Sequence, residues 1–492
     1  MPATPTEAAS QDSSYYAPDA RWRAFLPLAI VSIASTLNSS VINVSLPVIS
    51  QELRAGIGVV EWVILAFLLA ITSLLMISGR LGDLLGRRQV YQGGILLFTT
   101  ASALCGFSNS ITMLIVFRVL QGIGAALTVS VGPAIIGEIF PPNQRGKALG
   151  ILGTTVSVGL SVGPALGGFI TGWLGWRYIF FLNLPLGLLG AVLVGRNLRP
   201  SAPSQSTHFD IPGSFTMAAG LFGLMLVLSR GGEWGWGSQP IFLLLAGALV
   251  FLALFFWLEH RNADPVLDLT LFDNSIFRSA TFAGFLAFCS MFVQTFLLPF
   301  YLIQLRGFSP ACAGLFLMAV PSVMAVVAPT SGALSDRIGT RGLCSVGLAI
   351  QGISFVLLAT LDADSSQGFI VAALLVLGLG IGMFNPPNNS DLLSSVPRER
   401  LGNASGMMGL TRTLGMVCGV AMSSAIFTGV RNYILSSANP GSDEVTAQFA
   451  FVSGLRWAFW AAAGLAWLGM IMVWGRESRK RRKVEEQFIE PC

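Results

Sequence analysis

The amino-acid sequence predicts an all-α integral membrane protein with two six-helix bundles and two further helices inserted between them. Three observations lead to this fold class: an apolar composition, continuous apolar runs of about 20 residues, and an internal repeat. The chain has 492 residues, of which 53% are hydrophobic and 11% charged, and its mean hydropathy is +0.71. Soluble domains carry about 25% charged residues. We therefore expect lipid as the solvent, where only helices or closed barrels satisfy the backbone.

The apolar runs are continuous rather than alternating, so spanning helices are favoured over barrel strands. We expect fourteen spans, of which the short, Gly-rich segment 212–229 is the weakest. The predicted spans are 25–46, 60–78, 90–108, 111–133, 148–171, 178–195, 212–229, 240–258, 279–304, 311–334, 343–361, 368–392, 403–428 and 455–474.

The distribution of positive charge predicts the orientation. With the N-terminus placed in the cytoplasm, 21 of the 29 Lys and Arg residues fall on the inner side and six on the outer side. Arg118 and Arg412 fall within spans. Because cytoplasmic loops of membrane proteins are enriched in Lys and Arg, we expect a multi-pass protein of the plasma membrane with both termini cytoplasmic.

The two halves of the chain resemble each other. Gly79, Leu81, Asp83, Gly86 and Arg88 recur 253 residues later as Gly332, Leu334, Asp336, Gly339 and Arg341. Parallel six-helix repeats are one known transporter architecture, with the substrate site between the halves. We therefore divide the chain into a cytoplasmic tail (1–24), a six-helix bundle (25–200), two inserted spans with flanking loops (201–262), a second six-helix bundle (263–475) and a basic cytoplasmic tail (476–492).

Three local patterns suggest chemistry. After span 2 the chain reads Gly79-Arg-Leu-Gly-Asp-Leu-Leu-Gly-Arg-Arg88, which we interpret as a cytoplasmic loop with turn glycines, an acid and a cationic edge. Span 4 contains Arg118, which is costly in a membrane unless it is paired or near water; alternatively it snorkels to an interface. Span 5 carries Gly159, Gly163 and Gly167 on one helix face, a spacing that favours close helix packing.

Together these patterns resemble the signatures of the major facilitator superfamily, and in particular its fourteen-helix drug:proton antiporter branch. The loop resembles the motif between helices 2 and 3, and Arg118 resembles the helix-4 arginine motif. Span 5 resembles the helix-5 antiporter motif G-x-x-x-G-P-x-x-G-G. Its matching positions are Gly159, Gly163, Pro164, Gly167 and Gly168.

The resemblance implies roles for these residues. It implies a conformational latch between the two halves at Gly79, Asp83, Gly86, Arg87, Arg88, Asp336, Arg337 and Arg341. It implies proton coupling through Arg118, and the acids Glu138 and Glu61 are further candidates for carrying the proton. The helix-5 motif would shape the helix that seals one face of the transporter.

One position departs from the pattern of this branch. Its members usually carry an aspartate in span 1, and here the corresponding residue is Asn38. An amide cannot titrate or attract a cation by charge. With Arg118 and Arg412 inside spans and no acid clearly at the midplane, we expect a preference for neutral or anionic amphiphiles over cations. Transport without proton coupling stays open as an alternative.

Polar and aromatic residues of spans 1, 4, 9, 12 and 13 are candidates for lining the substrate cavity, although each is also an ordinary packing residue. They are Asn38, Asn43, Gln121, Phe292, Gln294, Phe296, Asn385, Asn388, Asn389 and Arg412.

Other functions are disfavoured. The two histidines, His208 and His260, lie in loops, no phosphate-binding Gly-rich loop is present, and the six cysteines form no CxxC pair. We therefore expect no enzyme activity, no cofactor and no metal. The expected partners are a small amphipathic substrate, protons and membrane lipid, with no nucleic acid, and the chain is expected to act as a monomer. An exporter or flippase of a lipid or an endogenous metabolite is the competing prediction.

Overall fold

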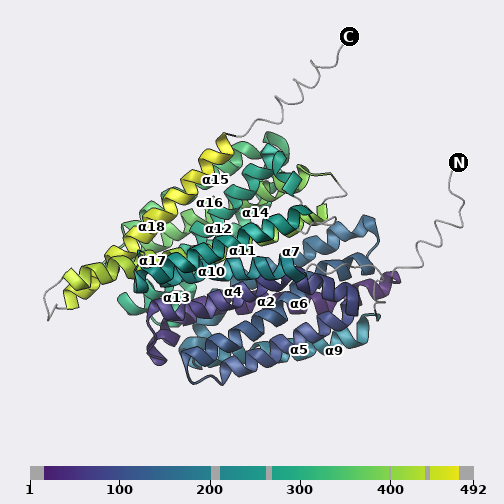
Figure 1. The fold of residues 1–492 in the computed structure, drawn as a ribbon, viewed down its shortest axis with the longest axis horizontal. Coiled ribbons are helices and arrows are strands. Elements are labelled where there is room, and N and C mark those ends of the chain that lie inside the picture. The colour runs from purple at the N-terminus through teal and green to yellow at the C-terminus, as the bar shows by residue number, and fades with distance from the viewer. Residues whose placement is uncertain are drawn as a thin grey trace, which may run out of the picture. The chain divides into compact units, whose positions relative to one another are not determined.

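A computed structural model of the chain describes residues 16–200, 211–235, 237–261, 269–397, 401–437 and 444–475, and this part is helical without any strand (Figure 1). The predicted basic tail at 476–492, most of the N-terminal tail, His208 and Trp236 lie outside the described residues. Each of the fourteen predicted spans coincides with a helix or with two consecutive helices. The all-helical fold class is therefore confirmed.

Eleven helical stretches of the described chain are long and apolar enough to cross a membrane. Three predicted spans are not among them. The helix over 90–108 begins with two arginines, the helix over 148–171 begins with a polar turn, and the segment 212–229 contributes only the shorter apolar stretch Phe215–Leu224. The membrane crossing of these three helices therefore stays a prediction.

The chain divides into two compact units. Unit 1 comprises 1–224, 246–258 and 309–314, and unit 2 comprises 225–245, 259–308 and 315–492. The helices of the first part of the chain are α2 (Pro18–Glu52), α3 (Ile57–Val60), α4 (Trp62–Leu85), α5 (Arg87–Gly106), α6 (Ile111–Ile139), α7 (Pro142–Trp173), α8 (Arg177–Phe181), α9 (Asn183–Asn197), α10 (Ile211–Trp234) and α11 (Gln239–Arg261).

The second part of the chain contains a similar series. Its helices are η1 (Leu269–Asp273), α12 (Ser275–Phe300), η2 (Tyr301–Leu305), α13 (Pro310–Leu317), α14 (Ala319–Ile338), α15 (Thr340–Ala359), α16 (Gln367–Ser394), α17 (Leu401–Ser437) and α18 (Glu444–Trp474).

The same five helix pairings occur in both units. In unit 1, α2 packs on α7 and α9, α4 on α6, and α5 on α6 and α9. In unit 2, α12 packs on α17 and α18, α14 on α16, and α15 on α16 and α18. Figure 1 shows α5 beside α9 within unit 1. The packing thus follows the repeat seen in the sequence.

The inserted helices α10 and α11 pack against each other through small residues. A Cβ added at Gly220 would lie 2.7 Å from Leu252, and one added at Gly223 would lie 3.0 Å from Ala248. In the most apolar stretch of α11 only 17% of the residues are buried inside the protein. The exposed remainder of α11 is apolar, as expected for a helix that faces lipid.

The two arginine-bearing turns differ from the loop that the sequence suggests. Helix α4 continues through Leu85, and α5 begins at Arg87, so Gly79 and Asp83 lie in the last turns of a helix. Only Gly86 breaks the helix, with a φ of 94°, and its repeat counterpart Gly339 has a φ of 88°. Since this left-handed conformation favours glycine, a single glycine is enough to reverse the chain, and the prediction of a longer loop is wrong.

Candidate functional site

A cluster of buried polar side chains joins four helices of unit 1. We call Asn38 of α2, Ser102 of α5, Gln121 of α6 and Asn183 of α9 the amide cluster; none of them is more than 5% exposed. The Nε2 of Gln121 donates to Asn38 Oδ1 at 3.1 Å and to Ser102 Oγ at 3.0 Å. The Nδ2 of Asn183 donates to the same two oxygens at 3.0 and 2.9 Å. The side chain of Asn38 is therefore held by two donors on one oxygen.

Arg118 extends the amide cluster along α6. Its Nη1 donates to Gln121 Oε1 at 2.7 Å, its Nε donates to the carbonyl oxygen of Val63 at 2.8 Å, and its guanidinium lies 4.1 Å from the centre of the Phe67 ring. It is 1% exposed, so snorkelling does not describe it. Among the described residues no carboxylate lies within 4 Å of this guanidinium. Carbonyl oxygens and an aromatic face stabilise the buried charge, in place of a counter-ion.

One donor group of the amide cluster is left over. The Nδ2 of Asn38 is buried and has no hydrogen-bond partner in the described part of the chain. Neither an asparagine nor a glutamine titrates, so the amide cluster stays neutral at any physiological pH and the charge beside it is that of Arg118. Chemically, the site offers N–H donors and one permanent positive charge, an arrangement that suits acceptor groups rather than cations.

The glycines of the helix-5 motif bring α7 against the turn of α2 that carries Asn38. A Cβ added at Gly163 would lie 2.4 Å from the Cβ of Ser40, and one added at Gly167 would lie 2.7 Å from the carbonyl oxygen of Val41. At Gly159 the corresponding distance to Thr36 Cβ is 3.0 Å. Because real Cβ atoms do not come so close, only glycine permits this crossing.

The remaining residues of the motif lie on the same helix. Pro164 is inside α7, and Gly168 faces the backbone of Pro310, which groups with unit 1. A Cβ at Gly168 would lie 2.3 Å from the carbonyl oxygen of Pro310. Gly168 thus allows a second close approach, on a different side of α7.

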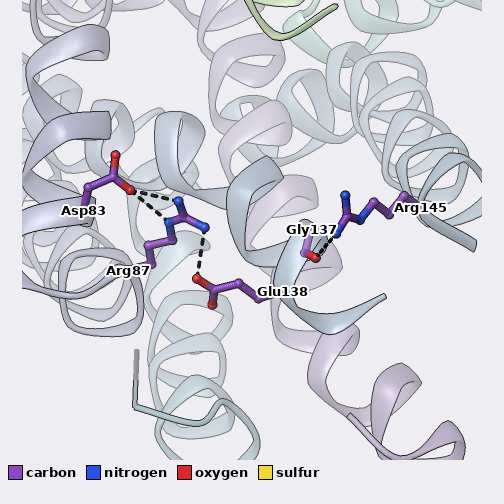
Figure 2. A network of polar contacts seen from close by, with 5 residues as sticks. All are labelled: Asp83, Arg87, Gly137, Glu138 and Arg145. Atoms are coloured by element: carbon purple, nitrogen blue, oxygen red, sulfur yellow. Dashed lines mark hydrogen bonds and ion pairs between the residues drawn. The ribbon is translucent and has the colours of Figure 1, made fainter. Parts of the chain in front are cut away.

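At the predicted cytoplasmic end of unit 1, Arg87 lies between two acids (Figure 2). Its Nε and Nη2 donate to Asp83 Oδ1 at 3.1 and 2.9 Å, and its Nη1 donates to Glu138 Oε1 at 3.0 Å. This ion-pair group joins the end of α4, the start of α5 and the end of α6. The side chains are 30 to 40% exposed, so water screens their attraction in part.

Two further arginines at this end contact backbone oxygens. Arg88 Nη2 donates to the carbonyl oxygen of Gly195 at 2.6 Å, and Arg145 Nη2 donates to that of Gly137 at 2.8 Å (Figure 2). Carbonyl oxygens near a helix end attract cations. These arginines therefore hold α9 and α6, respectively, at the same end of unit 1.

Unit 2 has related residues at the positions of the ion-pair group, with a threonine in place of the arginine and an aspartate in place of the glutamate. At the offset of 253 residues, Asp336, Thr340 and Asp391 correspond to Asp83, Arg87 and Glu138. The hydroxyl of Thr340 donates to Asp391 Oδ1 at 2.6 Å.

The arginines of this turn take no part in that hydrogen bond. Arg341 donates to the carbonyl oxygen of Trp474 and lies over its ring, while Asp336 and Arg337 are exposed. A threonine hydroxyl thus occupies in unit 2 the position that the Arg87 guanidinium has in unit 1.

The acids proposed for proton coupling lie in different surroundings. Glu61 is fully buried between α3 and α4, two residues before Val63, whose carbonyl oxygen receives the Arg118 bond. Glu138 belongs to the ion-pair group with Arg87. Glu61 is thus close in sequence to the carbonyl group that Arg118 binds, whereas Glu138 lies at the opposite end of α6 from Arg118.

The predicted cavity residues are divided between the two units. Asn38 and Gln121 meet in the amide cluster, whereas Asn43 donates to the Ser39 carbonyl oxygen of its own helix. In unit 2, Gln294 and Phe296 are buried in α12, and Phe292, Asn385, Asn389 and Arg412 are half-buried. Asn388 is buried and donates to the carbonyl oxygen of Ala280 at 3.1 Å.

Asn183 and Ser102 are members of the amide cluster that the sequence reasoning missed. Asn183 stands alone between apolar residues in Phe-Phe-Leu-Asn-Leu-Pro, and polar residues are costly inside a membrane span. A lone asparagine in an apolar segment could therefore have been picked out from the sequence as a candidate site residue. Ser102 carries no such signal, because a serine can bond its own helix backbone.

Comparisons with known proteins identify the family to which this chain belongs. The family model described as Major Facilitator Superfamily matches residues 28–212 and 211–420. The chain is 31% identical over 453 residues to the riboflavin transporter RibZ of Clostridioides difficile (strain 630), covering 92% of this chain and 96% of that protein. It is 32% identical to the multidrug transporter protein MdtP of Bacillus subtilis (strain 168), covering 86% and 78%. The crystal structure of a peptide transporter in complex with sulfate has a TM-score of 0.66 at 15% identity, covering 93% and 94%.

Proposed function

Because the chain belongs to the Major Facilitator Superfamily, whose members are membrane transporters rather than enzymes, we propose that it exports amphipathic small molecules in exchange for protons. The protein is thus a multi-pass membrane transporter of small molecules. Its likeness to a multidrug transporter supports export, and its likeness to bacterial transporters supports a place in the plasma membrane. Both termini would lie in the cytoplasm, and the protein would act as a monomer surrounded by lipid.

The observation that carries the substrate preference is the amide cluster with Arg118. A positive charge without a carboxylate within 4 Å in the described chain repels cations and attracts acceptors. Asn38 supplies a further N–H that lacks a partner. We therefore propose neutral or anionic amphiphiles as substrates, in preference to cations.

Alternating access needs contacts that hold one state and release in the other. We propose that the ion-pair group of Asp83, Arg87 and Glu138 is part of such a latch in unit 1, together with Arg88, and that Asp336, Arg337 and Arg341 have the corresponding role in unit 2. Partly exposed ion pairs are worth only about 0.2–1 kcal/mol each, so they can break during each cycle. Gly79 and Gly86 would permit the motion of this turn.

Proton coupling is proposed through Glu61. It is the buried acid closest in sequence to the carbonyl oxygen that binds Arg118. Protonation of a buried acid removes a charge from low dielectric, and Arg118 is the cation whose surroundings would change with it.

A second candidate function is transport of an endogenous metabolite without proton coupling, including export or flipping of a lipid. Asn38 favours it, because the amide cluster has no group that titrates. The likeness to a riboflavin transporter, which covers almost the whole chain, supports a metabolite as substrate.

Transport into inverted vesicles separates the two functions. Vesicles from cells with and without the protein would be tested with anilinonaphthalene sulfonate, ethidium, riboflavin and a fluorescent phospholipid, each with and without a pH gradient. The proposal expects uptake of the sulfonate that rises with an acidic interior. Uptake of riboflavin or the lipid alone, unchanged by the gradient, would support the second function instead.

A further inference from the structure

One face of α12 in unit 2 carries three residues that no proposed role yet uses. Thr281, Gly284 and Phe288 are three and four positions apart, so they lie along one face of the helix. Gly284 lets two other helices approach this face closely. A Cβ added there would lie 3.2 Å from Asn388 Nδ2 of α16 and 3.8 Å from Thr411 Cγ2 of α17. Three helices therefore meet around Gly284.

Two buried oxygens in this place have no hydrogen-bond partner. Asn388 is 3% exposed, and its Nδ2 donates to the carbonyl oxygen of Ala280, but its Oδ1 receives no hydrogen bond in the described part of the chain. The hydroxyl of Thr281, a residue that is 6% exposed, is likewise without a partner there. Buried polar atoms are nearly always paired, so both oxygens are available to a ligand.

A cation lies one helical turn further along the same face. The guanidinium of Arg412 lies over the Phe288 ring, 5.7 Å from its centre. Within the described ranges no carboxylate lies within 4 Å of Arg412. Phe288 and Arg412 are half-buried, whereas Asn388 and Thr281 are buried. The face thus has a partly open end with a cation and a ring, and a closed end with acceptors.

Together these groups select a ligand chemistry. Arg412 offers donors only, and the Oδ1 of Asn388 is an acceptor only. A carboxylate would accept hydrogen bonds from Arg412, but the Oδ1 of Asn388 would repel it. A neutral group that carries a carbonyl oxygen beside an N–H satisfies both, and a planar ring attached to it can pack on Phe288.

We propose that Thr281, Gly284, Phe288, Asn388 and Arg412 form a binding site for a planar aromatic imide or amide. The imide N–H donates to Asn388 Oδ1, and the adjacent carbonyl oxygen accepts from Arg412. The ring lies against Phe288, and the close approach of α16 and α17 at Gly284 closes the other end of the site. This inference rests on the proposed function, because it names the substrate class that unit 2 recognises.

The test is binding of a matched pair of fluorescent probes to the full chain in lipid nanodiscs, without any gradient. Naphthalimide has the imide N–H, and N-methylnaphthalimide lacks it. Wild type should bind naphthalimide about five- to tenfold more tightly, the worth of one hydrogen bond to a buried acceptor. Equal binding of the two probes, or no binding of either, overturns the proposal.

Variants locate the effect. Asn388→Leu should bind both probes equally, and Asn388→Asp, which keeps an acceptor of the same size, should retain the preference. Arg412→Met should weaken both probes at least about tenfold. Gln367→Leu, at an exposed position of the same helix, serves as the control and should change nothing. A preference that survives Asn388→Leu contradicts the assignment.

The outcome is separable from that of the proposed function. Probe discrimination in nanodiscs without export from vesicles leaves the site standing and removes the exporter. Export of amphiphiles without discrimination between the two probes supports the exporter and removes the proposed binding site.

Discussion

The crossing of α2 and α7 yields a prediction whose size can be worked from the structure. A Cβ added at Gly163 would lie 2.4 Å from Ser40 Cβ. Carbon atoms attract best at about 3.5–4.0 Å, so Gly163→Ala must separate the helices by roughly 1.1–1.6 Å at this point. Overpacking of this kind costs about 1–3 kcal/mol. We expect the free energy of unfolding to fall by that amount, measured by equilibrium unfolding in mixed micelles.

A double-mutant cycle isolates the contact. Ser40→Gly removes the atom that the new methyl group meets, at the cost of the hydrogen bond from Ser40 to the Leu160 carbonyl oxygen. The double variant should therefore be more stable than the sum of the single changes by about 1–3 kcal/mol. Gly137→Ala on α6 is the control, because a Cβ there meets nothing within 4 Å. If Gly163→Ala unfolds like Gly137→Ala, or the cycle shows no coupling, the argument about this crossing is refuted.

Three further predictions concern polar groups. Thr340→Arg should stabilise the protein by up to about 1 kcal/mol, because it recreates in unit 2 the cation of the ion-pair group, and Arg87→Thr should cost a similar amount; an unfolding series that shows the opposite order contradicts the comparison. Asn183→Leu should lower the free energy of unfolding by about 1–3 kcal/mol, since it removes one of two donors to Asn38 Oδ1; an unchanged value would mean that the bond is not made in the membrane. Asn38→Asp should shift vesicle transport toward cations, because it adds a negative charge to the amide cluster; an unchanged preference would separate residue 38 from substrate choice.

The helices and their pairing follow from features that are local in the sequence. Apolar runs long enough to cross a membrane predict each helix, and the 253-residue repeat predicts that both units pack in the same way. The spacing of Gly159, Gly163 and Gly167 predicts a close helix contact. The spacing does not predict that the partner helix is α2, because the partner is determined by the packing of the whole bundle.

The polar contacts are harder to predict from the sequence than the helices are. Asn183 bonds Asn38 across 145 residues, and Glu138 bonds Arg87 across 51. Only tertiary packing brings such pairs together. The sequence also does not predict how far α4 extends, because Gly79 and Gly82 are typical of turns. In a tightly packed bundle, however, a helix tolerates glycine. In both cases the tertiary packing determines the structure, and this packing cannot be deduced from the local sequence.

We propose that the buried charge of Arg118, with the unpartnered Nδ2 of Asn38 beside it, makes this transporter prefer neutral or anionic amphiphiles. The most direct measurement is the ratio of uptake rates of anilinonaphthalene sulfonate and ethidium into the same inverted vesicles, with vesicles lacking the protein subtracted. We expect faster uptake of the sulfonate than of ethidium, and a smaller ratio of the two rates in Arg118→Gln. Faster uptake of ethidium by the wild-type protein would contradict it.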